Sequence, residues 1–339
     1  STPAPASPEV SLLTEDKVFR YCIETAGKAA GTTSPMLFCG ERGTGKGLLA
    51  RTSHDLSPRK DGPFLALDFR AVPESLLEGI LFGTEEGAFT GAADRPGILE
   101  LAAGGTVYLD EISAIPPRIQ DRLQAALDLG LAPRVGSAGT AREVDVKFMS
   151  SSSEPLKEIL NSGRVRPGLL VRLGVVTLNL PPLRERRGDV PLLTGHFVRT
   201  FAEFFGKDAR DVSDEVGGAF ARHDWPSNVG ELKCGIEGAM NAVSLGEASL
   251  RPQHFSSTLL GRLFRDDAMS PGSAGSPGGG QRQVHYLHSA AEAERIAAAL
   301  EAAGGNAAKA ARSLKISPQL MNYKLKKFSL KKKITVQVG

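Results

Sequence analysis

Short apolar runs bounded by turn residues recur along the first half of the chain and alternate with segments of helical periodicity. The apolar runs occupy residues 36–39, 64–67, 106–109, 144–149 and 175–180. Helical spacing is clearest over 47–54 and 117–129. Apolar strands that alternate with helices are typical of a parallel sheet covered on both faces. The pattern therefore predicts an α/β fold up to about residue 182.

The pattern changes in the second half of the chain. Apolar residues recur at helical spacing over 192–204 and 229–243, without strand signals, which predicts a helical subdomain. Residues 268–281 have the Gly, Ser and Pro content of a flexible linker. A helix over 290–303 and two short helices ending near residue 328 should follow. This arrangement predicts a helix-turn-helix, with an unrelated three-helix bundle as the alternative.

Composition excludes several classes of protein. The chain has 339 residues, 41% hydrophobic and 23% charged, which is enough to build more than one core and excludes a small disulfide-stapled or disordered protein. Three cysteines at no metal-ligand spacing fit a reducing cytoplasm. No apolar run approaches the roughly 20 residues of a membrane helix. Position 1 is serine, so we expect a trimmed amino end.

Charge is unevenly distributed along the chain. The net charge is +3, but residues 302–339 carry nine Lys or Arg and no Asp or Glu, which leaves 32 basic and 38 acidic residues before them. A basic module on a mildly acidic body indicates binding to a polyanion such as DNA. The alternative is a Lys-rich end that is merely solvated.

A phosphate-binding motif directly follows the strand predicted at 36–39. Its spacing is G-x-x-x-x-G-K, in which glycines let backbone N–H groups converge on phosphate and the lysine adds a full positive charge. Gly47 follows, where most P-loops place a hydroxyl on magnesium. The candidate nucleotide-binding residues here are the motif, Gly40, Glu41, Arg42, Gly43, Thr44, Gly45 and Lys46, and the following Gly47.

Two carboxylates end the strand predicted at 106–109, at the sheet edge that carries the P-loop. Asp110 is placed to hold Mg²⁺ and Glu111 to polarise an attacking water. An acidic pair by itself would be a solvated strand end. Beside a P-loop, the pair predicts hydrolysis of a nucleotide such as ATP.

A loop with small residues around a Phe-Thr tip lies between these motifs, and its sequence is GAFTGA. In isolation it would be a turn with a buried Phe. With GERGTGKG, GGTVYLDEI, LNLPPLRERRGDVPLL, WPSNVGEL and the C-terminal GGNAAKAARSLKISPQLMNYKLKKF, however, it resembles the bacterial enhancer-binding proteins, the NtrC-like AAA+ activators of sigma-54 RNA polymerase. The likeness is collinear over about 12–330.

The resemblance implies a role for each matching position. The P-loop would bind ATP phosphates, Asp110 would hold Mg²⁺, and Glu111 would activate water. Arg166 and Arg172 are similar to two arginines that reach the nucleotide of a neighbouring subunit. The loop that contacts sigma-54 would be Gly87, Ala88, Phe89, Thr90, Gly91 and Ala92. The C-terminal segment resembles a Fis-type helix-turn-helix, whose DNA-binding residues would be Ser317, Gln319, Asn322, Tyr323, Lys324, Lys326 and Lys327.

The resemblance also implies an organisation and a set of partners. We expect a cytoplasmic, ATP-driven transcription activator without a membrane segment, whose subunits assemble, from dimers, into a ring of six or seven. Its partners would be sigma-54 RNA polymerase holoenzyme and upstream double-stranded DNA. The expected organisation is a linker over 1–9, an α/β AAA+ subdomain over 10–182, a helical lid over 183–263, a linker over 264–283, a helix-turn-helix domain over 284–330 and a basic tail over 331–339.

Four positions depart from the family pattern. Ser153 replaces a sensor asparagine, Gly230 replaces a lid arginine, and Asp68 replaces an asparagine that holds the catalytic glutamate; Ile80 replaces an acidic residue. These departures support an alternative, a DNA-binding regulator that binds ATP but hydrolyses it poorly. A further alternative is a P-loop ATPase that acts directly on nucleic acid, in which GAFTGA would have no evident role.

Overall fold

The computed structural model describes residues 12–88, 92–137 and 141–264, together with 296–301, 303, 307, 309, 310 and 321. These residues divide into two compact units. The first comprises 1–193 and 224–232, and the second comprises 194–223 and 233–339. The boundary assigns 224–232, from the segment expected to be the lid, to the first unit.

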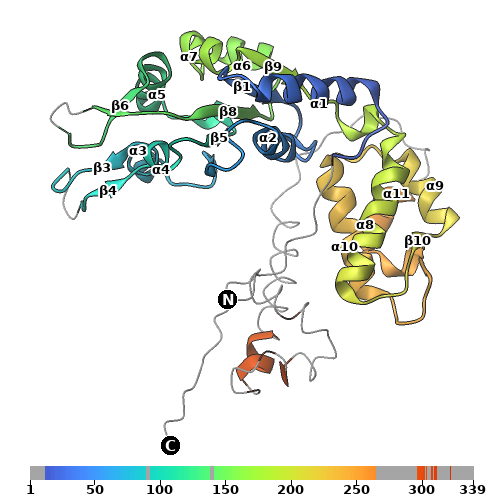
Figure 1. Ribbon diagram of the computed structural model, residues 1–339. Coiled ribbons are helices and arrows are strands. Elements are labelled where there is room, and N and C mark those ends of the chain that lie inside the picture. Colours follow the sequence, from blue (N-terminus) through green and yellow to red (C-terminus); the bar gives the residue numbers. More distant parts are fainter. Residues whose placement is uncertain are drawn as a thin grey trace, which may run out of the picture. The chain divides into compact units, whose positions relative to one another are not determined.

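The first unit is built on a parallel five-stranded sheet (Figure 1). Its order is β2 (Phe64–Asp68), β5 (Thr106–Asp110), β8 (Lys147–Ser152), β1 (Met36–Cys39) and β9 (Val176–Asn179). The predicted α/β class and parallel sheet are confirmed. β8 begins and ends three residues later than expected, and it includes three serines. Backbone pairing with β1 holds all three serines in the strand, Ser150 is also paired with β5, and the Ser150 hydroxyl donates to the carbonyl of Met36.

Side chains of each strand alternate between two helical layers. Met36 and Phe38 of β1 pack with α1 (Lys17–Ala30) and α2 (Lys46–Asp55). Leu37 and Cys39 face the second layer, which includes α3 (Glu74–Phe82), α5 (Pro117–Leu129), α6 (Leu156–Ser162) and α7 (Pro167–Leu173). Because both faces are buried, the strand is apolar throughout.

Helix α1 is capped at both ends. Asp16 accepts a hydrogen bond from the backbone N–H of Phe19 at 2.7 Å. At the other end, the buried Lys147 of β8 donates through Nζ to the carbonyls of Ala29, Ala30 and Thr32, at 2.6, 3.1 and 2.6 Å. Burial lowers the pKa of Lys147 to about 8. The lysine therefore joins α1 to the centre of the sheet.

Two small hairpins project from the second layer. The first pairs β3 (Gly83–Thr84) with β4 (Arg95–Pro96), and the second pairs β6 (Leu131–Pro133) with β7 (Ala141–Glu143). Arg134, 8% exposed, joins them through ion pairs to Asp94 and to Glu100 of α4 (Ile98–Leu101), at 2.7 and 2.6 Å. The short helices η1 (Ile112–Ala114) and η2 (Leu183–Glu185) complete this unit.

The second unit is mainly helical, as predicted. It contains most of α8 (Asp189–Phe205) and α10 (Asn228–Ala242), with α9 (Asp214–Arg222), η3 (Pro252–His254) and α11 (Ser257–Leu263). Its core includes a row of rings on α8, Phe197, Phe201 and Phe205, with centroids 6.3 and 5.9 Å apart. Two short parallel strands, β10 (Asp211–Val212) and β11 (Ser249–Leu250), were not expected, because two residues are too few to produce a periodic pattern.

The described C-terminal residues are helical where the sequence predicts the first helix of the helix-turn-helix. Residues 296–301 form a helical segment, and Ile296, Leu300, Ala310 and Met321 form an apolar cluster. The residues expected to contact DNA lie outside the described part of the chain. Among the described helices, none is long and apolar enough to cross a membrane.

Candidate nucleotide-binding site

The P-loop joins β1 to α2 in a conformation that requires glycine. Gly40, Gly43 and Gly45 have φ angles of 151°, 83° and 109°, a region that other residues rarely adopt. A Cβ on Gly43 would lie 2.2 Å from the carbonyl oxygen of Ser227, and one on Gly40 would lie 2.7 Å from that of Leu180. The sequence motif therefore forms the strand–loop–helix arrangement that phosphate binding needs.

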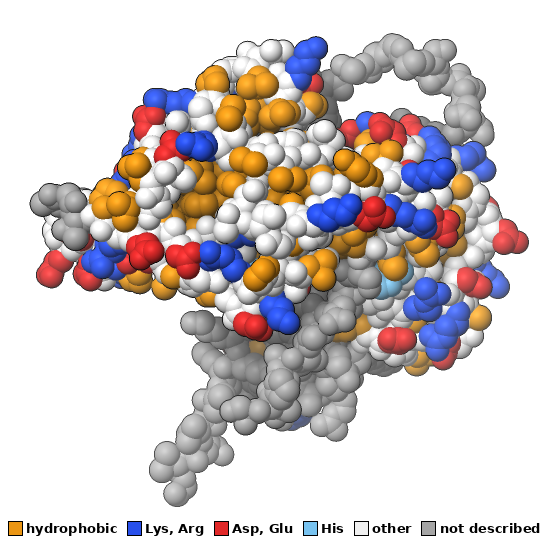
Figure 2. All heavy atoms as spheres, turned by 45° about the horizontal axis from the view of Figure 1, so that its top comes forward, with side chains coloured by type: hydrophobic (Ala, Val, Ile, Leu, Met, Phe, Trp, Pro, Cys, Tyr) orange, Lys and Arg blue, Asp and Glu red, His pale blue; other side chains and the backbone are white. Residues whose placement is uncertain are grey.

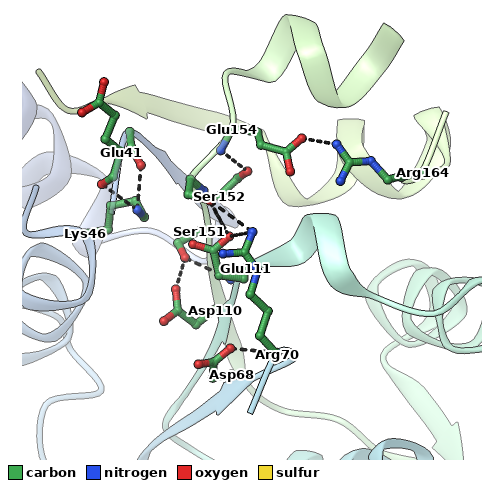
Figure 3. Close-up of polar contacts among 12 residues, drawn as sticks. Glu41, Lys46, Asp68, Arg70, Asp110, Glu111, Ser151, Ser152, Glu154 and Arg164 are labelled. Atoms are coloured by element: carbon green, nitrogen blue, oxygen red, sulfur yellow. Dashed lines mark hydrogen bonds and ion pairs between the residues drawn. The ribbon is translucent and has the colours of Figure 1, made fainter. Parts of the chain in front are cut away.

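Lys46 opens α2 and turns its ammonium group back onto the loop. Its side chain is buried, and Nζ donates to the carbonyls of Gly40 and Glu41 at 2.6 and 3.1 Å (Figure 3). Burial lowers the pKa of Lys46, although the negative charges of Glu111 and Asp110 oppose this shift. A phosphate bound in the loop would add the anionic partner that this buried cation lacks.

Side chains distant in sequence brace the loop. Arg184 forms two hydrogen bonds to the carboxylate of Glu41, at 2.6 and 2.8 Å, and these bonds lower the pKa of Glu41. Asn228 donates through Nδ2 to Glu41 and to the carbonyl of Arg42, at 3.1 and 2.9 Å. Sequence reasoning missed both residues, although they lie inside the family segments LNLPPLRERRGDVPLL and WPSNVGEL.

Thr44 and Gly47 complete the loop differently from a P-loop with a serine or threonine after the lysine. The Thr44 hydroxyl donates to the carbonyl of Glu41 at 2.8 Å, and the Thr44 carbonyl accepts from Arg186 at 2.8 Å. Gly47 offers no hydroxyl, and a Cβ there would have ordinary contact, 3.8 Å, with the ring and hydroxyl of Tyr108. A metal ion must therefore take its protein ligands elsewhere.

Asp110 ends β5 and Glu111 follows it, at the edge where the P-loop lies (Figure 3). Asp110 accepts hydrogen bonds from the Tyr108 hydroxyl at 3.1 Å and from Ser151. Carboxylate oxygens beside a phosphate site suit Mg²⁺, which is held by one or two carboxylates with phosphate and water. The two carboxylates beside the phosphate loop fit a magnesium ion carried in with a nucleotide.

Glu111 is buried and has a left-handed backbone conformation, with φ 61° and ψ 60°. Its Oε2 accepts from Arg70 at 2.9 Å, from the Ser153 hydroxyl at 2.8 Å and from the Ser153 backbone N–H at 3.3 Å. Asp68 makes a different contact, because its Oδ1 accepts the backbone N–H of Arg70 at 2.9 Å. Sequence reasoning missed Arg70; its position two residues after the end of β2, at the same sheet edge, is the signal that could have found it.

The two candidate arginine fingers lie at the two ends of α7, in the helical layer opposite α2: Arg166 is the N-cap residue and Arg172 is in the last turn. Arg166 forms an ion pair with Asp121, and Arg172 forms one with Asp128, both acids on α5. The arginine side chains are 52% and 57% exposed. Exposed pairs contribute about 0–1 kcal/mol, so either arginine can leave its partner for a stronger anion at little cost.

Gly230 lies beside the P-loop at the start of α10. The neighbouring Val229 donates its backbone N–H to the carbonyl of Gly43 at 3.1 Å. A Cβ on Gly230 would lie 3.9 Å from the Cα of Gly43, which leaves room for a side chain. The position could therefore accommodate a side chain, and glycine provides none.

The GAFTGA loop is described only at its base. Gly87 donates its backbone N–H to the carbonyl of Ala92 at 3.3 Å, which closes the loop. Thr84, just before it, donates its hydroxyl to the carbonyl of Ala93 at 2.7 Å. Phe89, Thr90 and Gly91 lie outside the described residues. The base is thus held on the β3–β4 hairpin.

Three family models match successive parts of the chain. Residues 12–179 match the sigma-54 interaction domain, residues 184–270 match the AAA+ ATPase lid domain, and residues 289–328 match the bacterial regulatory protein, Fis family. The matches follow one another in the order of the sequence motifs.

Whole-chain comparisons agree with these matches. The chain is 37% identical over 320 residues to the transcriptional activator RocR of Bacillus subtilis, covering 94% of this chain and 68% of RocR. It is 36% identical to the transcriptional regulatory protein ZraR of Escherichia coli, covering 96% and 70%. For the phenol regulator MopR of Acinetobacter guillouiae, which is 34% identical over 93% of this chain, the match spans only 56% of the relative.

A solved structure resembles the whole chain. NtrX from Brucella abortus in complex with ATP is 26% identical, with a TM-score of 0.67, over 95% of this chain and 70% of NtrX. The family matches, the relatives and the fold agree with the P-loop and the acidic pair at one sheet edge. The chain belongs to the AAA+ transcriptional activators that carry a sigma-54 interaction domain and a Fis-type DNA-binding domain.

Proposed function

We propose that this chain binds Mg²⁺-ATP at the P-loop and uses ATP hydrolysis to activate sigma-54-dependent transcription. The observation that carries the proposal is the placement of Lys46, Asp110 and Glu111 at one sheet edge, in a chain of this family. A structure of the related NtrX holds ATP, which supports the choice of nucleotide.

Each residue of the site has a defined task in this proposal. The loop N–H groups and Lys46 bind the phosphates, and Asp110 holds Mg²⁺, which neutralises phosphate charge. Glu111 accepts the proton of the water whose oxygen attacks the terminal phosphorus, and the bond from that phosphorus to the departing ADP breaks. Tyr108 and Ser151 orient Asp110 through their hydrogen bonds.

We propose that the ATP site is completed by a second copy of the chain. Arg166 and Arg172 are exposed and weakly paired, so they are free to reach a neighbour's terminal phosphate, where a guanidinium supports phosphoryl transfer. The helices at the top of Figure 1, which come forward in Figure 2, also expose apolar side chains, including Leu160 on α6 and Val171 on α7. Val171 precedes Arg172 and would be covered by the neighbour.

The partners follow from the two other parts of the chain. Residues 87–92 would contact the sigma-54 RNA polymerase holoenzyme, and the ring of subunits would move this loop as ATP is hydrolysed. The Fis-type domain, whose expected DNA contacts include Asn322, Tyr323 and Lys324, would bind upstream double-stranded DNA and concentrate subunits there. Since the partners are bacterial polymerase and promoter DNA, we place this activity in the cytoplasm.

A second candidate is a DNA-binding regulator of the same family that binds ATP but hydrolyses it slowly. The contacts of Glu111 with Arg70 and Ser153 favour it, because they occupy one oxygen, Oε2, of the carboxylate that must receive a proton. The missing side chain at Gly230 favours it as well. Turnover measured with and without sigma-54 polymerase distinguishes the two candidates.

The deciding experiment is calorimetric titration of Mg²⁺-ATP into the full chain and into Lys46→Ala. Without its cation, the P-loop must hold several phosphate charges on backbone dipoles alone, so the variant should lose most of its ATP affinity. Arg118→Ala, which removes an exposed arginine paired with Glu74 on α3, should leave affinity unchanged. Equal affinity of Lys46→Ala and the unmodified chain would refute the P-loop assignment.

A further inference from the structure

Glu111 is flanked by donors from both neighbouring strands. In the sheet, β5 lies between β2 and β8, so the end of β5 meets the residues that follow both neighbours. Arg70 follows β2 and Ser153 follows β8, and both donate to the same carboxylate oxygen, Oε2. Arg70 also donates to the Ser153 hydroxyl at 3.3 Å, so the three side chains form a closed triangle.

The backbone fixes Arg70 in this place. Asp68 accepts the backbone N–H of Arg70, and the next residue, Ala71, donates its N–H to the Asp68 carbonyl at 3.1 Å. Phe69 donates its N–H to the Asp110 carbonyl at 3.2 Å, and its ring is buried in the core. With Phe69 directed inward and the turn closed by Asp68, the Arg70 side chain lies over the sheet edge and reaches Glu111 (Figure 3).

The contact between Arg70 and Glu111 is stronger than the surface ion pairs of this chain. The Glu111 side chain is 9% exposed and that of Arg70 is 43% exposed, so the acid is removed from water while the arginine is partly solvated. Removing the partner of a buried charge leaves that charge uncompensated, so it costs more free energy than removing one member of an exposed ion pair. Hydrogen bonds to charged groups are also stronger than those between neutral groups.

We propose that Arg70, together with Ser153, is a positioning residue that clamps Glu111 and slows ATP hydrolysis. The inference rests on the proposed function, because it takes Glu111 as the base. To accept a proton from water, the carboxylate needs a free lone pair directed at that water. The clamp fills Oε2 with three donors and fixes the plane of the carboxylate, so Oε1 is left to accept the proton and the clamp sets the direction in which Oε1 points. Hydrolysis then requires Arg70 and Ser153 to release Oε2, and this requirement lowers the rate of ATP hydrolysis.

The test separates turnover from binding in the full chain. Arg70→Ala should raise kcat roughly tenfold, the effect of releasing a charge-assisted hydrogen bond, and should leave ATP affinity unchanged. Arg70→Lys, which keeps a cation, should return kcat toward the unmodified value. Ser153→Ala should give a smaller increase, because the backbone N–H of residue 153 still donates. Arg118→Ala, of similar exposure, should leave kcat unchanged.

Two further variants make the result decisive. Glu111→Gln in the Arg70→Ala background should remove the gain; persistence of the gain would overturn the clamp. If Arg70→Ala shows no thermal unfolding transition, and so does not fold, Arg70→Gln is used in its place. The inference is also overturned if Arg70→Ala, or Arg70→Gln in its place, binds ATP normally but its kcat is unchanged or lower. Failure of the unmodified chain to bind ATP is a separate outcome and refutes the proposed function.

Discussion

At the scale of single residues, the structure connects positions at which the sequence is expected to depart from its family. Asp68, expected to replace an asparagine, contacts its own turn, while Arg70 makes the contact with Glu111. Ser153 is shorter than asparagine, yet its hydroxyl still reaches the glutamate at 2.8 Å. A short side chain at this position therefore still contacts the proposed base.

The departures at Ser153 and Gly230 give a prediction at the same scale. The double substitution Ser153→Asn and Gly230→Arg introduces the side chains that the resemblance implies for the family, and the space beside Gly43 accommodates the arginine Cβ. If the two side chains recover about 1.4 kcal/mol of transition-state stabilisation, the steady-state rate of ATP hydrolysis rises roughly tenfold. Slower turnover in the double variant, or family-typical turnover in the unmodified chain, would show that other residues sense the phosphate.

At the scale of elements, the contact between Lys147 and the end of α1 predicts how stability depends on pH. The pKa of Lys147 is about 8 in the folded chain, below its ordinary 10.5. Between these values the unfolded chain binds more protons, so this group raises the unfolding free energy as pH increases from 8 to 10.5. Below pH 8 Lys147 is protonated in both the folded and the unfolded chain, so its contribution to the free energy of unfolding does not change with pH.

The comparison that isolates Lys147 uses Lys147→Met, which keeps the length of the side chain and leaves three carbonyls at the end of α1 without their donor. The free energy of unfolding of the variant should be lower than that of the unmodified chain by about 2 kcal/mol, so the variant should unfold at a lower denaturant concentration at every pH. Denaturant titrations from pH 7.5 to 10 should show the gap to the unmodified chain widening above pH 8. A gap that narrows with rising pH would contradict the predicted sign.

The β3–β4 hairpin gives a prediction for the GAFTGA loop. Thr90→Val removes a hydroxyl at the expected tip, while the base is held through Thr84, Gly87 and the Arg134 network. We expect unchanged ATP affinity and assembly but weaker capture of sigma-54, measured by pull-down with a trapped hydrolysis analogue. Full promoter activation by the variant would assign the loop a purely structural role.

At the scale of the whole molecule, the nucleotide site lies within the first compact unit, which ends at residue 232. Deletion of residues 268–339 should therefore abolish specific DNA binding and preserve ATP binding. Gel-shift titration with promoter DNA and calorimetry with Mg²⁺-ATP measure the two properties on the same sample. Tight, sequence-specific DNA binding by the truncated chain would place the DNA-binding surface elsewhere.

The sequence by itself determined the α/β class, most of the parallel strands, the P-loop and the acidic pair. These features are local: apolar runs specify buried strands, and glycines that must adopt positive φ leave a fixed spacing. The likeness of GAFTGA and the C-terminal segment to one family determined the expected partners in the same way. Each signal lies within a few consecutive residues, so no three-dimensional information was needed to find it.

Only the tertiary structure decided what surrounds these motifs. Arg70, Arg184 and Asn228 reach the site from segments 41 to 187 residues away from their partners, and no spacing rule relates them. The order of the sheet places β2 and β8 on either side of β5, and this adjacency joins Arg70 and Ser153 at Glu111. Strand order depends on how helices cover the two faces of the sheet, which is a property of the packed chain and not of any one segment.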